Sequence, residues 1–181
     1  MLKKKNPIIA AVLSFVFGPF GYLYIGWKYF IMAFVMFAVF IAVLILTNLD
    51  PAVLLPDTRR WLKFPLLMVL AWKAYTICSV RNALIDAKDE NVNALNSFPI
   101  VAMAMSDLLV GIGMVYAAAI GIYVSVKMFL IGNLVKGFLY LIIGTPVLVW
   151  IASLAFGLIA MGIDALFAKG AENVFRKRYS A

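Results

Sequence analysis

Two charged residues lie inside apolar stretches of the chain and are the best placed to do chemistry. Lys73 is about nine residues into the stretch 64–82, and Asp107 is about nine residues into the stretch 98–126. At 1.5 Å per residue each lies roughly 13 Å from the start of its own helix, so both reach a similar depth on consecutive antiparallel helices. A charge at that depth is costly and is usually paired or functional. We expect a Lys73–Asp107 pair that either locks two helices together or forms part of a proton or cation relay.

Asp164 is a third charged residue of interest, near the inner end of the apolar stretch 137–168. Two roles fit it. It either pairs with Lys127 or Lys136, or it is a helix-end charge in the hydrated headgroup layer.

Small residues recur at four-residue intervals in the stretch 98–126, at Gly113, Ala117 and Gly121. They line one face of a helix, and such faces let membrane helices approach closely. The pattern predicts tight helix packing, either within the chain or between copies of it.

Catalytic and metal-binding patterns are missing from the sequence. It has no histidine, a single cysteine (Cys78), no phosphate-binding loop, no Gly-x-Ser-x-Gly and no carboxylate cluster with metal spacing. We therefore predict a protein that is not an enzyme and that holds no catalytic residue, cofactor or metal.

Composition decides the broad class. The 181 residues are 66% hydrophobic and 13% charged, with a mean hydropathy of +1.04, which leaves too little polar surface to coat a water-soluble globule. The chain predicts an all-α, polytopic integral membrane bundle that forms a single membrane domain over 1–181. The net charge of +8 reflects membrane topology and contact with the lipid bilayer, and we expect no nucleic acid partner.

Five apolar stretches divide the chain: 7–25, 29–48, 64–82, 98–126 and 137–168. Gly144-Thr145-Pro146 interrupts the last one, because proline removes a backbone donor and clashes with the preceding turn. Splitting the stretch there gives six spans. Four or five spans also fit, since Asn133 and Lys136 suit a re-entrant or interfacial segment.

Basic residues orient these spans through the positive-inside rule. With a cytoplasmic N-terminus, the inner side of the six-span arrangement holds Lys3, Lys4, Lys5, Arg59, Arg60, Lys63, Lys127, Lys136, Lys169, Arg176, Lys177 and Arg178. The outer side holds Lys28, Arg81 and Lys88. Both termini are then cytoplasmic, and their basic residues Lys3, Lys4, Lys5, Arg176, Lys177 and Arg178 face anionic lipid. The lack of Asn-x-Ser/Thr sites favours a bacterial inner membrane.

The two halves of the chain resemble each other. PIIAAVLS at 7–14 matches PIVAMAMS at 99–106, and NALIDAKDENV at 82–92 matches DALFAKGAENV at 164–174. Either a duplication or coincidence in apolar sequence accounts for this; a duplication gives repeats at 6–95 and 98–178. Three spans in each half make an inverted repeat, which is common in small transporters.

The stretch GPFGYLYIGWKYF at 18–30 predicts a turn at Gly18, Pro19, Gly21, Tyr24 and Gly26, because glycine permits tight turns and aromatic rings anchor helix ends at the headgroups. Its G-x-L-Y-x-G motif resembles the hairpin of the TM-two domain, over 6–48 only, and is similar to the membrane segment that precedes some bacterial signal peptidases. The resemblance implies that a first span turns directly into a second. It carries over no peptidase chemistry and implies no single activity.

Two functions fit these observations. The first is a structural, accessory or assembly subunit that binds a protein partner or copies of itself within the membrane. The second is a small channel or transporter with an inverted repeat and an intramembrane Lys73/Asp107 site.

Overall fold

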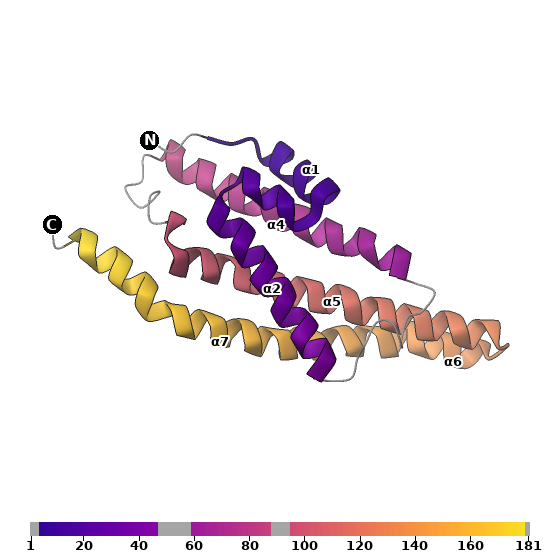
Figure 1. Cartoon of the computed structure of the whole chain (residues 1–181). Coiled ribbons are helices and arrows are strands. Elements are labelled where there is room, and N and C mark those ends of the chain that lie inside the picture. Colours follow the sequence, from indigo (N-terminus) through magenta and orange to yellow (C-terminus); the bar gives the residue numbers. More distant parts are fainter. Residues whose placement is uncertain (1–3, 47–58, 88–94, 180–181) are drawn as a thin grey trace.

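The computed structural model describes residues 4–46, 59–87 and 95–179, without the side chains of 59–62 and 175–179. Every regular element within these ranges is helical, which confirms the predicted all-α bundle (Figure 1). In chain order the elements are α1 (Pro7–Phe17), the 3-10 helix η1 (Gly18–Tyr24), α2 (Trp27–Leu46), α4 (Arg59–Asp86), α5 (Phe98–Leu130), α6 (Leu134–Leu139), the π-helical turn η3 (Tyr140–Gly144) and α7 (Thr145–Tyr179).

α1 is a short helix with well-defined ends. The Asn6 side chain caps it by accepting a hydrogen bond from the Ile8 N–H at 2.9 Å, and Pro7 fits the first helical position, where no amide hydrogen is needed. Gly18 ends α1 with a φ of 61°, a left-handed conformation that favours glycine. The chain therefore reverses direction after 11 residues, or about 16 Å of helix.

η1 runs back alongside α1 and returns to where α1 began. Gly21 packs directly on the preceding helix, where an added Cβ would lie 2.3 Å from the backbone nitrogen of Ser14. At the end of η1, the Tyr24 hydroxyl accepts a hydrogen bond from the Asn6 N–H at 3.1 Å. The segment α1–η1 is thus a hairpin whose two ends lie together.

Five segments are long and apolar enough to cross a membrane: Pro7–Tyr24, Trp27–Leu46, Lys63–Asp86, Phe98–Leu130 and Leu134–Val174. The first of these is the α1–η1 hairpin, which is folded in two and reaches only about half of the roughly 30 Å of a hydrocarbon core. The expectation that 7–25 is a full span that turns at the far interface is therefore wrong. Of the other four segments, those of α4, α5 and α6–α7 run along the bundle, and that of α2 crosses α5 and α7 obliquely (Figure 1).

The predicted split at Gly144-Thr145-Pro146 is also absent. α6, η3 and α7 follow one another without a break from Leu134 to Tyr179. The wider π-helical turn absorbs the proline, and the Thr145 hydroxyl donates to the Tyr140 carbonyl at 3.0 Å, which satisfies an acceptor within that turn. The segment is one candidate span, so the described residues hold four full-length candidate spans and the hairpin, in place of the six spans predicted.

The helices define two ends of the bundle. At the proximal end lie the C-terminal end of α4, with Lys5 bonded to Asn82 there, the start of α5 and the C-terminal end of α7, whereas the distal end holds the start of α4 and the α5–α6 turn (Figure 1). Each half of the chain begins and ends at the proximal end. The two halves thus run in the same direction, and the inverted arrangement expected from three spans per half is wrong.

This topology also corrects the distribution of basic residues. The proximal end holds Lys4, Lys5, Lys28, Arg81, Lys169, Arg176, Lys177 and Arg178. The distal end holds Arg59, Arg60, Lys63, Lys127 and Lys136. Lys28 and Arg81 therefore lie on the same side of the bundle as Lys4 and Lys5, whereas the sequence predicted them on the opposite side. The reason is that the α1–η1 hairpin ends on the side where it began. Lys3 and Lys88 lie outside the described residues.

α5 and α7 form a long antiparallel pair. An added Cβ on Gly113 would lie 2.1 Å from the Phe156 ring, and one on Gly121 would lie 2.8 Å from the Thr145 Cα. The predicted small-residue face therefore serves packing within the chain. α2 crosses this pair, with the Phe40 ring 5.7 Å from that of Tyr116 and 5.6 Å from that of Phe156.

Candidate functional site

The structure brings Lys73 and Asp107 together. α4 and α5 pass each other with an added Cβ on Gly111 only 2.9 Å from the Val69 side chain, and one turn nearer the proximal end the Lys73 ammonium pairs with the Asp107 carboxylate. The two partners differ in burial, since the Lys73 side chain is 15% exposed and that of Asp107 is 66% exposed. The pair therefore lies on the outer surface of the bundle, about 13 Å along α5 from Phe98.

A groove of about 190 Å³ leads to this pair. Its lining comes from α2, α4, α5 and the segment before α5, and consists of Tyr29, Lys73, Thr76, Ile77, Val80, Arg81, Leu95, Met103, Ala104 and Asp107. Tyr29, Arg81 and Leu95 lie at the proximal end, whereas Lys73 and Asp107 are the lining residues deepest along α4 and α5. The groove thus extends from the buried Tyr29 and Arg81 at the proximal end to the charged pair farther along α4 and α5.

Asp164 has a different partner from the ones predicted. The Ser106 hydroxyl donates to its Oδ1 at 2.7 Å and so ties α7 to α5. Lys127 lies about 30 Å farther along α5 than Ser106 and stands over the Tyr123 ring at 4.8 Å, and Lys136 is also at the distal end. The expected pairing with Lys127 or Lys136 is therefore wrong, because those residues occupy the opposite end of the bundle.

A polar cluster at the base of the α1–η1 hairpin was not predicted. The Asn82 side chain accepts from the Lys5 N–H at 3.1 Å and donates to the Lys5 carbonyl at 2.6 Å, while the Lys5 ammonium donates to the Tyr24 carbonyl. The Cys78 thiol also donates to the Lys5 carbonyl at 3.2 Å. The signal for this cluster was the spacing of Cys78, Arg81 and Asn82, which places polar groups on one face of a helix.

Arg81 is the most buried charge of the cluster, with 4% of the residue exposed. Its Nη1 donates to the Ile25 carbonyl at 2.8 Å, at the point where the hairpin leads into α2. Burial lowers the pKa of the Lys5 ammonium, and the nearby Arg81 charge lowers it further. From the sequence, Arg81 was predicted only to lie on the outer side of the membrane, because it stands at the very end of the apolar stretch 64–82.

The predicted lipid-facing basic residues are only partly described. Lys4 pairs with Asp86, and both side chains are more than half exposed, which suits the hydrated end of a bundle. Lys5 instead points into the hairpin base. Arg176, Lys177 and Arg178 belong to the last turns of α7, where the structure gives the backbone only.

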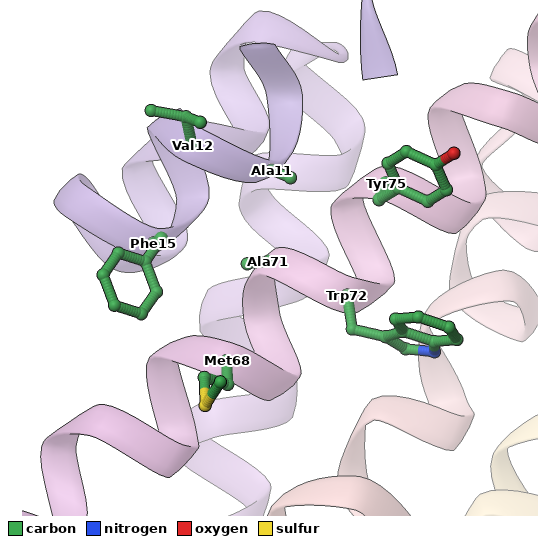
Figure 2. A pocket seen from close by; sticks show the side chains of 7 residues that line it. All are labelled: Ala11, Val12, Phe15, Met68, Ala71, Trp72 and Tyr75. Carbon is green, nitrogen blue, oxygen red and sulfur yellow. The ribbon is translucent and has the colours of Figure 1, made fainter. Parts of the chain in front are cut away.

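A second groove, of about 450 Å³, lies between α1 and α4 (Figure 2). Its lining is apolar apart from the indole and phenol groups, and consists of Ala11, Val12, Phe15, Met68, Ala71, Trp72 and Tyr75. Figure 2 shows Val12 and Phe15 on α1 facing the strip of α4 that carries Met68 and Ala71. A surface of this kind suits hydrocarbon chains, because its lining is almost entirely apolar.

Among the described residues, no group of three His, Cys, Asp or Glu side chains could hold a metal ion. Comparison with protein-family models, with curated proteins and with solved structures gives no match. The architecture therefore defines the class on its own: the chain is a helical integral membrane protein, whose described residues form four full-length apolar helices and one folded-back hairpin.

Proposed function

We propose that the chain is a structural or accessory subunit of a membrane complex, and that a transmembrane helix of a partner protein covers the groove between α4 and α5. One observation carries this proposal: the Lys73–Asp107 pair lies within the apolar stretches of α4 and α5, about 13 Å along α5 from Phe98, with the Asp107 carboxylate 66% exposed on the outer surface. Charged residues at this depth almost always face a bundle interior or a water-filled cavity. A partner helix over the groove provides that interior.

The groove lining supports the same assignment. Thr76 and Ala104 are small or polar side chains beside the pair, and they leave room for a close approach by a neighbouring backbone. Asp107 keeps acceptor capacity that a hydroxyl or amide from a partner would use. Lipid offers neither of these interactions.

Site-specific photocrosslinking in the native membrane tests the proposal. A photoreactive residue replaces Ala104 in the groove, and the matched control replaces Ala155, an exposed alanine of α7 outside the groove lining. We expect a single protein adduct from position 104 and lipid adducts from position 155. Lipid adducts alone from both positions would contradict the proposal.

A small channel or transporter remains the second candidate, because the groove reaches the charged pair from the proximal end. Under this hypothesis Asp107 exchanges a proton or binds a cation, and Lys73 is its counter-charge. Liposome flux assays that compare the wild type with Asp107→Asn distinguish the two functions. A flux abolished by the substitution would favour transport over the accessory role.

We also propose that the proximal end faces the cytoplasm of a bacterial inner membrane. Eight described basic residues lie at that end against five at the distal end, as counted from the sets given above, so the positive-inside rule favours cytoplasmic termini. The resemblance of residues 6–48 to the TM-two domain also remains a proposal, and it rests on the G-x-L-Y-x-G motif alone.

A further inference from the structure

A pocket of about 280 Å³ opens at the start of α2, beside the polar base of the hairpin. It is lined by Ile25, Gly26, Trp27, Lys28, Tyr29, Arg81 and Asn96. Two of these residues are cationic and none is acidic. Since a liquid water occupies about 30 Å³, the pocket has room for a group of several heavy atoms.

Arg81 gives the pocket an uncompensated charge. The residue is 4% exposed, its Nη1 is bonded only to the neutral Ile25 carbonyl, and its Nε has no hydrogen-bond partner. Asp86 pairs with Lys4 and Asp107 pairs with Lys73, and within residues 4–46, 59–87 and 95–179 Arg81 belongs to neither ion pair. A buried charge without a counter-ion is costly, so the site favours an anion from outside the chain.

Other donors converge on the same space. Lys28 is held at the rim, where its ammonium donates to the Asn96 carbonyl at 2.7 Å and keeps two further hydrogens. The first turn of α2 leaves backbone N–H groups without intrahelical partners and adds the positive end of the helix dipole. Trp27 is 63% exposed beside the pocket, as suits an indole at the headgroup layer.

We propose that this pocket binds a phosphate group, with Arg81 and Lys28 as its cationic ligands. Its position at the proximal end of the bundle places it at headgroup depth, so the phosphate belongs either to an anionic lipid or to a soluble phosphate compound. Basic pockets between membrane helices recognise lipid head groups by this chemistry. The pocket shares Tyr29 and Arg81 with the α4–α5 groove, whereas Lys28 lines the pocket and not the groove, so Lys28 distinguishes the two sites.

Native mass spectrometry and thermal stability of the full chain in nanodiscs test the site. The lipid probe is one phosphatidylglycerol in ten of phosphatidylcholine, and the soluble probe is inorganic phosphate added to pure phosphatidylcholine discs. We expect the wild type to retain one phosphatidylglycerol and to be stabilised by it. Stabilisation by inorganic phosphate as well would assign the site to soluble phosphates.

The variants are Arg81→Gln and Lys28→Gln, with Lys136→Gln as the matched control at the distal end. We expect at least tenfold weaker binding of the probe for Lys28→Gln and Arg81→Gln, and unchanged binding for Lys136→Gln. Lys28 is exposed, so its substitution tests the site even if Arg81→Gln fails to fold. The proposal is overturned if neither probe binds the wild type, or if Lys28→Gln and Lys136→Gln bind equally well.

Discussion

The α1–η1 hairpin and the α5–α7 pair both place glycine against a neighbouring helix, but they differ in how they treat polar groups. The hairpin is short, and its base is tied by Lys5, Arg81 and Asn82 to backbone groups. The α5–α7 pair is far longer, and its glycines Gly113 and Gly121 lie against Phe156 and Thr145, with one side-chain hydrogen bond from Ser106 to Asp164 near the proximal end. The difference teaches that a segment too short to cross the bilayer needs polar anchors at one surface, whereas a long pair is held by packing.

The contact of Gly21 with α1 is the most sensitive point of this comparison. A Cβ there would lie 2.3 Å from Ser14 N and 2.4 Å from Ser14 Cα, so Gly21→Ala must open the hairpin. We expect a loss of about 3 kcal/mol in the free energy of unfolding, measured in mixed micelles. Gly157→Ala is the control, since nothing lies within 4 Å of its added Cβ. Equal stability of the two variants would contradict the hairpin packing.

The corresponding change in the long pair is Gly121→Ala. The added Cβ meets the Thr145 hydroxyl at 2.4 Å and the Thr145 Cα at 2.8 Å, but the two helices can shift apart without unfolding. We expect a loss of about 2 kcal/mol in the same unfolding assay. Gly162→Ala, which has open space around its added Cβ, should cost nothing. A larger loss for Gly121→Ala than for Gly21→Ala would reverse the comparison.

The Lys73–Asp107 pair joins α4, the helix that packs on the hairpin, to α5, and its loss should have the next largest effect on stability. Asp107→Asn leaves the largely buried Lys73 ammonium without its counter-charge. We expect this single change to cost about 1–3 kcal/mol, reduced by the exposure of Asp107, and to cost more than the double change Lys73→Met with Asp107→Leu. Measuring the unfolding free energies of the single and the double variant tests whether the two charges stabilise each other. Equal losses would show that the pair contributes no coupling.

Ser106→Ala gives the smallest effect. It removes the hydrogen bond to Asp164 between α5 and α7, and interhelical hydrogen bonds in membranes contribute about 0.6 kcal/mol on average. The matched control is Ser125→Ala, whose hydroxyl donates to the Gly121 carbonyl of its own helix at 2.8 Å. A double-mutant cycle with Asp164→Ala measures the coupling. A coupling near zero would leave packing as the source of the pair's stability.

Part of this architecture follows from the sequence. The class is set by composition, and the contact between Lys73 and Asp107 follows from their equal depth on consecutive helices. The role of Gly113 and Gly121 follows from their spacing on one helix face. In each of these cases the local sequence pattern and the geometry of the α-helix are sufficient to predict the feature.

The errors share a physical cause. An apolar run has the same composition whether it crosses the bilayer or turns back, so only the left-handed Gly18 and the fit of Gly21 on Ser14 distinguish the hairpin from a span. Pro146 breaks a regular α-helix, but a π-helical turn accommodates it. Once the hairpin returns to its own side, Lys28 and Arg81 change sides, and the buried Arg81 cluster forms from segments 56 residues apart.

The topology around the hairpin is the central claim, and cysteine labelling tests it most directly. Cys78 is the chain's single cysteine, so Cys78→Ser gives a background for Lys4→Cys, Lys28→Cys and Asn133→Cys. Each variant is reacted in sealed, oriented vesicles with a membrane-impermeant maleimide. If the α1–η1 hairpin folds back, we expect positions 4 and 28 to be labelled from the same side and position 133 from the opposite side. Labelling of position 28 from the side opposite to position 4 would show that residues 7–25 cross the membrane and would contradict the hairpin topology.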